Sequence, residues 1–175
     1  MRNRTSGLTL IELMLALALG AVIASLALPS MRDFMQRQRI SATANELLAN
    51  INLARMHAVY QREFAVMCPS SNQASCTGGN RWDAGWIVFR DPDNNGQPDA
   101  PSDLLRVRQA VSNLVLDSAG RFRIRYQADG SARGSNLTIK LCDPHLPSQS
   151  RAIIVSNPGR PRVDELPGHL SCASG

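Results

Sequence analysis

The chain has 175 residues, and its formal net charge of +5 corresponds to a sequence pI of about 9.6. Of its 19 basic residues, all except Lys140 are arginine, a bias that favours forked contacts with phosphate or carboxylate groups. The length allows an apolar anchor and one globular domain of ordinary size. Because the sequence contains no Gly-x-Ser-x-Gly motif, phosphate loop or dinucleotide fingerprint, we expect neither an enzyme nor a bound cofactor.

An apolar segment with a single charged residue lies near the N-terminus. Between residues 8 and 28 the only charge is that of Glu12, and a helix of these residues would span roughly 32 Å, about one bilayer core. A carboxylate at that depth costs about 2 to 3 kcal/mol or more unless it has a partner. If the chain were cut between Gly7 and Leu8, the new α-amine would lie one helical turn from Glu12, and the amine of a neighbouring chain could pair with the same carboxylate. We therefore expect Glu12 to act in assembly.

The start of this segment resembles a known processing signal. Residues 7–12 read Gly-Leu-Thr-Leu-Ile-Glu and follow a short leader that contains Arg2 and Arg4. This pattern is similar to the class III signal of type IV pilins and pseudopilins. The resemblance implies that prepilin peptidase cuts after Gly7 and methylates the new N-terminus at Leu8, a position where this family usually has phenylalanine.

On this interpretation the leader is residues 1–7, and the transmembrane and assembly helix is residues 8–28. The precursor would be a single-pass protein of the inner membrane. The alternatives are an ordinary secretory signal and a plain membrane anchor. For a secretory signal, the Ala-Ser-Leu-Ala sequence at residues 24–27 is a poor cleavage site.

A second helical pattern follows Pro29. Apolar residues recur at spacings of three and four and form one stripe, which consists of Ile40, Ala44, Leu47, Ile51, Ala54 and Ala58. This spacing predicts an amphipathic helix over residues 29–62 that packs against a sheet. Gly20 and Pro29 are the positions where the long helix could bend or locally unwind. A helix over residues 8–62 with its second half buried in a globular head resembles the architecture of pilins.

The sequence after Glu63 changes to short β-like runs separated by Gly, Pro, Asn and Asp. This composition predicts an antiparallel, β-rich head over residues 63–175, and therefore an α+β fold. The expected strands cover residues 64–68, 86–90, 104–109, 121–127, 137–141 and 152–156.

A second resemblance lies within the head. Residues 82–91 read Trp-Asp-Ala-Gly-Trp-Ile-Val-Phe-Arg-Asp, and Asp-Asn-Asn-Gly follows at residues 93–96. These residues resemble the signature of the FimT and GspH family of minor pilins and minor pseudopilins. The resemblance implies a β-rich head on the C-terminal half of the long helix.

The stretch over residues 91–96 also matches the first half of a calcium-binding loop. Asp99 and Asp103 lie nearby and could supply further oxygen ligands. A solvated turn is the alternative that we favour, because Asp, Asn, Gly and Pro populate turns for local reasons. We therefore expect no metal ion.

Four cysteines in an exported chain indicate two disulfides: Cys68, Cys76, Cys142 and Cys172. The sequence does not choose among the three possible pairings. A bond between Cys68 and Cys76 would close a short Ser/Asn/Gly-rich loop, and one between Cys142 and Cys172 would tie down the tail.

Positive charge accumulates in the second half of the head. Residues 104–165 hold ten basic residues and five acidic ones. A strand at residues 121–127 would place Arg121, Arg123 and Arg125 on one face, with apolar residues on the other. A solvated outer sheet face is the interpretation that we favour for this row.

The segment at residues 157–162, Asn-Pro-Gly-Arg-Pro-Arg, predicts an ordered projecting loop with Arg160 and Arg162 on an extended backbone. Two arginines at this spacing can bridge phosphates, or they can form ion pairs with Asp164 and Glu165, and local chemistry does not choose between these roles.

The residues Gly159-Arg160-x-Arg162 resemble the Gly-Arg-x-Arg motif of FimT minor pilins that bind DNA in natural transformation. The resemblance implies phosphate contacts by Arg160 and Arg162, with Gly159 shaping the turn.

The sequence therefore predicts a minor pilin that is incorporated into a type IV pilus, or at its tip, and binds extracellular double-stranded DNA non-specifically for uptake. The expected partners are DNA, other pilins, prepilin peptidase and, before assembly, the inner membrane. The alternatives are a purely structural minor pilin that primes pilus assembly and a GspH-like minor pseudopilin of type II secretion.

Overall fold

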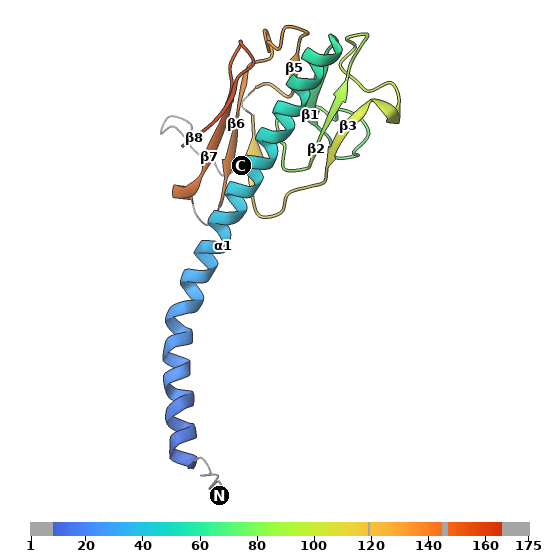
Figure 1. Cartoon of the computed structure of the whole chain (residues 1–175). Coiled ribbons are helices and arrows are strands. Elements are labelled where there is room, and N and C mark those ends of the chain that lie inside the picture. The colour runs from blue at the N-terminus through green and yellow to red at the C-terminus, as the bar shows by residue number, and fades with distance from the viewer. Residues whose placement is uncertain (1–8, 119, 145–146, 166–175) are drawn as a thin grey trace, which may run out of the picture. The chain divides into compact units, whose positions relative to one another are not determined.

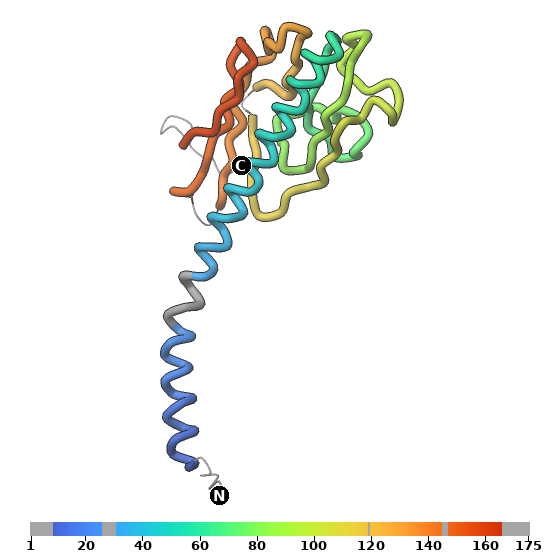
Figure 2. Tube along the Cα trace, in the orientation of Figure 1, coloured from blue at the N-terminus to red at the C-terminus, as the bar shows by residue number. Residues whose placement is uncertain are grey.

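The computed structural model describes the chain except for residues 1–8, 119, 145–146 and 166–175, and it leaves out the side chains of residues 26–30 (grey in Figure 2). The chain forms two compact units, Met1–Gln38 and Arg39–Gly175. We refer to the second unit as the head.

One helix, α1 (Leu10–Gln61), continues through Gly20 and Pro29. Its first turn is capped by Thr9, whose Oγ1 accepts a hydrogen bond of 3.4 Å from the N–H of Glu12. A Thr three residues before a Glu is a known sequence signal of a helix start, because the first N–H groups lack partners within the helix. Among the described residues, no helix is both long enough and apolar enough to cross a membrane.

The head contains two four-stranded antiparallel sheets that flank the second half of α1 (Figure 1). The first sheet has the order β3-β2-β1-β5 and consists of β1 (Ala65–Pro69), β2 (Trp86–Arg90), β3 (Leu104–Arg108) and β5 (Ile124–Tyr126). The second has the order β4-β6-β7-β8 and consists of β4 (Val115–Asp117), β6 (Leu137–Cys142), β7 (Arg151–Val155) and β8 (Pro161–Glu165). Two short 3-10 helices, Pro101–Asp103 and Pro147–Gln149, lie in the connections. The predicted α+β fold with an antiparallel head is confirmed.

The core forms where the apolar stripe of α1 meets the inner faces of both sheets. All six stripe residues are buried, with at most 2% of their surface exposed: Ile40, Ala44, Leu47, Ile51, Ala54 and Ala58. In the same cluster, Trp86 and Val88 come from the first sheet, and Ile139 and Ile153 come from the second. The stripe of α1 therefore joins the two sheets into one core.

The predicted strand at residues 121–127 is wrong in its first half. Only β5 forms, and it pairs with residues 65–67 of β1. If this pairing continued, Phe122 would lie opposite Pro69, which has no N–H to donate to the ladder. Phe122 is instead 39% exposed and does not join the core with Ile124 and Tyr126.

Two strands were not predicted. β4 has three residues, too few to show an alternating pattern. β8 begins with a proline and is mostly charged, but it pairs along its whole length with β7. Because β8 lies at the edge of its sheet, it tolerates both features. The loop expected at residues 157–162 is therefore a hairpin turn that leads directly into a strand.

A disulfide joins Cys68 to Cys76, with a Cα–Cα distance of 5.6 Å. It borders a second buried cluster, on the outer face of the first sheet, that contains Val66, Ile87 and Phe89. Cys142 is also disulfide-bonded, and Cys172, its expected partner, lies outside the described residues.

We predict that replacing Cys68 and Cys76 together with alanine destabilises the head by about 2 to 3 kcal/mol, because the bond closes a loop of short sequence separation in the unfolded chain. Urea unfolding of a fragment of residues 39–175 would measure the loss. The control is the unsubstituted fragment under the same non-reducing conditions. If the two proteins unfold at the same urea concentration and with the same dependence of the unfolding free energy on urea, the prediction is contradicted.

Candidate nucleic-acid interface

The two arginines of the Gly-Arg-x-Arg motif lie on the hairpin between β7 and β8. In the ladder, Ile154 pairs with Arg162 and Val155 pairs with Pro161. Because side chains alternate along a strand, Arg162 lies on the face opposite to the buried Val155. Both Arg160 and Arg162 are exposed. The hairpin therefore presents the two guanidinium groups on the outside of the head.

The turn of the hairpin is packed tightly against the rest of the head. Gly159 is buried and has φ +82, a left-handed conformation that favours glycine. A Cβ at this position would overlap the carbonyl oxygen of Gly130 and would lie 2.9 Å from Cε1 of Tyr126. The motif glycine is therefore required both by its conformation and by the close approach of the neighbouring backbone.

Tyr126 and Arg55 hold this turn in place. The hydroxyl of Tyr126 donates a hydrogen bond of 3.0 Å to the carbonyl oxygen of Gly159. Burial raises the pKa of Tyr126, so the phenol keeps its proton and remains a donor. From α1, Arg55 donates through Nε to the carbonyl oxygen of Gly130 at 3.0 Å and through Nη2 to that of Pro158 at 3.4 Å.

Sequence reasoning missed Arg55, Tyr126 and Gly130 as parts of this site. Arg55 is the residue directly after Ala54 of the apolar stripe, and Tyr126 alternates with Ile124, but neither pattern identifies a distant carbonyl as a partner. These contacts depend on how the helix, β5 and the hairpin meet in space.

Nearby carboxylates neutralise part of the charge of the hairpin. Nε of Arg162 lies 3.7 Å from Oδ2 of Asp164, and Nη1 of Arg151 lies 3.9 Å from Oε1 of Glu165. Arg160 forms no ion pair within the part of the chain that the structure describes. Exposed ion pairs contribute about 0 to 1 kcal/mol, so Arg162 can exchange Asp164 for a phosphate at little loss.

The turn between β2 and β3 uses its carboxylates to bind its own backbone. Asp91 accepts hydrogen bonds from the N–H of Gly96, although its burial raises its pKa. The N–H of Ala100, together with the guanidinium of Arg90, holds the pKa of Asp103 below its usual value. Across the described residues, no group of three or more His, Cys, Asp and Glu side chains is arranged to hold a metal ion.

The predicted cleavage, methylation and assembly residues belong to the first unit of the chain, Met1–Gln38. Glu12 is exposed in the first turn of α1. Gly7 and Leu8 lie outside the described residues, so their cleavage and methylation stay predictions.

The fold is similar to those of solved pilin-like proteins. The type IV minor pilin FimU of Pseudomonas aeruginosa (strain PAO1) aligns with a TM-score of 0.60 and 21% identity, over 75% of this chain and 92% of that chain. A second crystal form of FimU gives a TM-score of 0.57 and 20% identity, over 71% and 92%. The minor pseudopilin EpsH of the Vibrio cholerae type 2 secretion system gives 0.52 and 10%, over 74% and 98%. The shared fold is that of pilin-like subunits.

The family follows from the sequence comparisons. A model of the prokaryotic N-terminal methylation motif matches residues 2–28. A family model described as type II transport protein GspH matches residues 43–159, which is more than half of the chain. The chain therefore belongs to the GspH family, and it is a minor pilin or minor pseudopilin. No curated protein sequence matches it significantly.

We predict that Gly159→Ala destabilises the head far more than Gly134→Ala. Both glycines have positive φ, but a Cβ at Gly134 would meet nothing within 4 Å, whereas one at Gly159 would overlap backbone. The expected losses are about 1 kcal/mol for Gly134→Ala and roughly 3 kcal/mol or more for Gly159→Ala. Urea unfolding of the two variants measures the difference, and equal losses would show that the hairpin turn is not packed as described.

Proposed function

We propose that this protein is a minor pilin whose head binds double-stranded DNA through the backbone phosphates. The observation that carries the proposal is the exposure of Arg160 and Arg162 on a hairpin whose turn is held by Gly159, Tyr126 and Arg55. Because the turn is held in place, the backbone that carries the two arginines needs little ordering when a ligand binds, and affinity gains from such preorganisation.

The spacing of the two arginines suits a phosphate backbone. Residues two apart on an extended strand are roughly 6.5 Å apart, and their side chains lie on the same face. Each guanidinium can form a forked pair with one phosphate, so Arg160 and Arg162 could contact neighbouring phosphates of one DNA strand. Contacts of this kind do not read bases, and binding would be non-specific and strongly dependent on salt.

The N-terminal segment would provide assembly. The methylation motif at residues 2–28 supports cleavage after Gly7 by prepilin peptidase and methylation of Leu8. Glu12 would then pair with the α-amine of its own or a neighbouring subunit inside the membrane or the filament. The precursor would be anchored in the inner membrane, and the mature subunit would lie in the pilus or at its tip. Retraction of such a pilus would draw bound DNA toward the cell for natural transformation.

A second candidate function is that of a minor pseudopilin in type II secretion. The observation that favours it is the family model, whose description is a type II transport protein. A pseudopilin would contact secreted proteins or other pseudopilins, and it would have no need of exposed phosphate-binding arginines. DNA binding by the wild-type head therefore separates the two candidates.

We predict that Arg160→Ala combined with Arg162→Ala weakens binding of a short double-stranded DNA and lowers the slope of log Kd against log salt by about 2, since two phosphate contacts are lost. Fluorescence anisotropy with the full chain in detergent micelles would measure both quantities.

The matched control is Arg81→Ala combined with Arg106→Ala, which removes the same charge from exposed arginines outside the hairpin. The control should bind nearly as the wild type does. If the hairpin variant and the control bind DNA equally well, the hairpin is not the binding site; if the wild type binds no DNA, the proposed function is wrong.

A further inference from the structure

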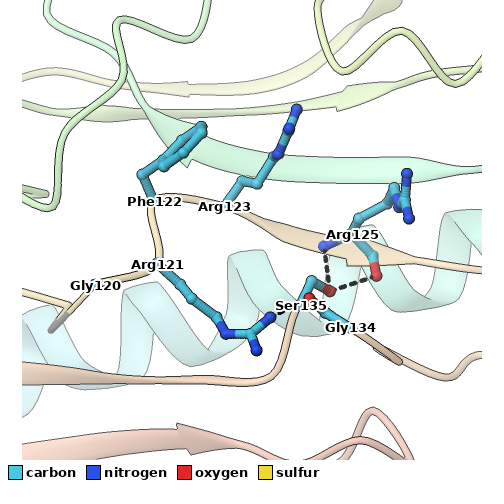
Figure 3. A pocket seen from close by; sticks show the side chains of 7 residues that line it. All are labelled: Gly120, Arg121, Phe122, Arg123, Arg125, Gly134 and Ser135. Atoms are coloured by element: carbon cyan, nitrogen blue, oxygen red, sulfur yellow. Dashed lines mark hydrogen bonds between the residues drawn. The ribbon is translucent and has the colours of Figure 1, made fainter.

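The head also has a groove that is lined by three arginines (Figure 3). It has a volume of about 250 Å³, and its lining comprises Gly120, Arg121, Phe122, Arg123, Arg125, Gly134 and Ser135. Residues 121–123 precede β5 and do not pair with β1. The three side chains therefore do not form the flat row on a strand that the sequence predicted.

The structure holds the groove arginines in defined positions. The backbone N–H of Arg125 donates to Oγ of Ser135, which in turn donates to the carbonyl oxygen of Arg125, both at 2.9 Å. The Arg125 guanidinium donates to Oδ1 of Asn94 at 2.7 Å and lies 5.5 Å from the ring centre of Phe64. Arg121 donates to the carbonyl oxygen of Gly134.

Arg123 is held from two sides. Its guanidinium lies over the ring of Phe122, at 5.1 Å from the ring centre. A Cβ at Gly96 would overlap Nη1 of Arg123, so the side chain also packs against the turn between β2 and β3. The guanidinium groups of the groove are thus preorganised by contacts that leave donor N–H groups available.

The charge of the groove is not neutralised within the described residues. Most other arginines of the head form ion pairs with acidic side chains: Arg81, Arg90, Arg108, Arg133, Arg151 and Arg162. In the described chain, no such pair involves Arg121, Arg123 or Arg125, and no acidic residue lines the groove. Three uncompensated positive charges at one concave site favour an anion with several negative charges.

The groove is continuous with the hairpin. Gly134 lines the groove and also a second depression, whose other residues are Ser131, Arg133, Asn157 and Pro158. Asn157 and Pro158 belong to the turn that precedes Gly159 and Arg160. A basic track therefore runs from Arg123 past Arg121 and Arg133 to the hairpin.

We infer that the groove is a second phosphate-binding subsite, which takes the backbone of the same DNA that the hairpin binds. This inference rests on the proposed function, and it extends the DNA footprint from the two hairpin arginines to a track that includes Arg121 and Arg123. Arg162 of the hairpin is paired with Asp164, whereas the groove arginines form no ion pair among the described residues. The groove therefore supplies at least as much of the salt-dependent affinity as the hairpin.

The test replaces Arg121 and Arg123 with glutamine in the full chain, in detergent micelles, and measures Kd for a short double-stranded DNA at several salt concentrations. Arg125 is left intact because it binds Asn94. The slope of log Kd against log salt should fall by about 2 relative to the wild type. Arg81→Gln combined with Arg106→Gln removes the same charge elsewhere and should leave the slope unchanged.

A lysine variant separates loss of charge from misfolding as the cause of any change in DNA binding. Arg121→Lys combined with Arg123→Lys retains both charges and should retain the slope, although the forked donors are lost. Loss of the slope in the lysine variant, or a glutamine variant that binds as its control does, would overturn the inference. If the glutamine variant binds as its control does but the hairpin variant binds weakly, the inference is wrong and the proposed function stands. If the wild type binds no DNA, both the inference and the proposed function are wrong.

Discussion

The burial of one helical stripe between two sheets is the constraint on which the head depends. Ala44, Ala54 and Ala58 in this stripe are small, so the sheets can approach the helix closely, and the larger Leu47 and Ile51 fill the space between them. The polar residues beside the stripe then reach the sheets. Glu46 pairs with Arg108 of β3 at 2.9 Å, and Arg55 binds the turn of the β7–β8 hairpin.

This arrangement explains how an exposed hairpin can be rigid. The hairpin lies at the edge of its sheet, where strands commonly fray, but its turn is held by a glycine that no other residue can replace without displacing Gly130, and by donors from Tyr126 and Arg55. A ligand that meets Arg160 and Arg162 therefore encounters a surface ordered by the core. The same core positions β5, whose Arg125 lines the arginine groove.

The distribution of ion pairs separates arginines that stabilise the head from arginines that are available to a ligand. Arg90 and Arg108 bind acidic side chains and connect elements of the structure. Arg121, Arg123 and Arg125 lie in a groove that no acidic residue of the described part of the chain lines. Total charge does not distinguish these two groups, because guanidinium groups contribute equally to the charge whether or not they are paired. The groove that we propose as a phosphate-binding subsite contains arginines of the second group.

Local sequence patterns determined the secondary-structure elements of this protein, and the tertiary structure determined which residues lie together at the candidate site. Because periodicity and composition are properties of neighbouring residues, they were sufficient to predict α1, its buried stripe, β2 and the antiparallel head. They failed where pairing decides the outcome. The ladder between β5 and β1 ends at the pair of Ile124 and Met67, before it reaches Pro69, and the charged β8 forms because β7 offers it a free edge. The motif made Arg160 and Arg162 candidates for phosphate contacts. The packing of Gly159 on Gly130 and the groove at Arg121 require distant segments to meet, which no local pattern records.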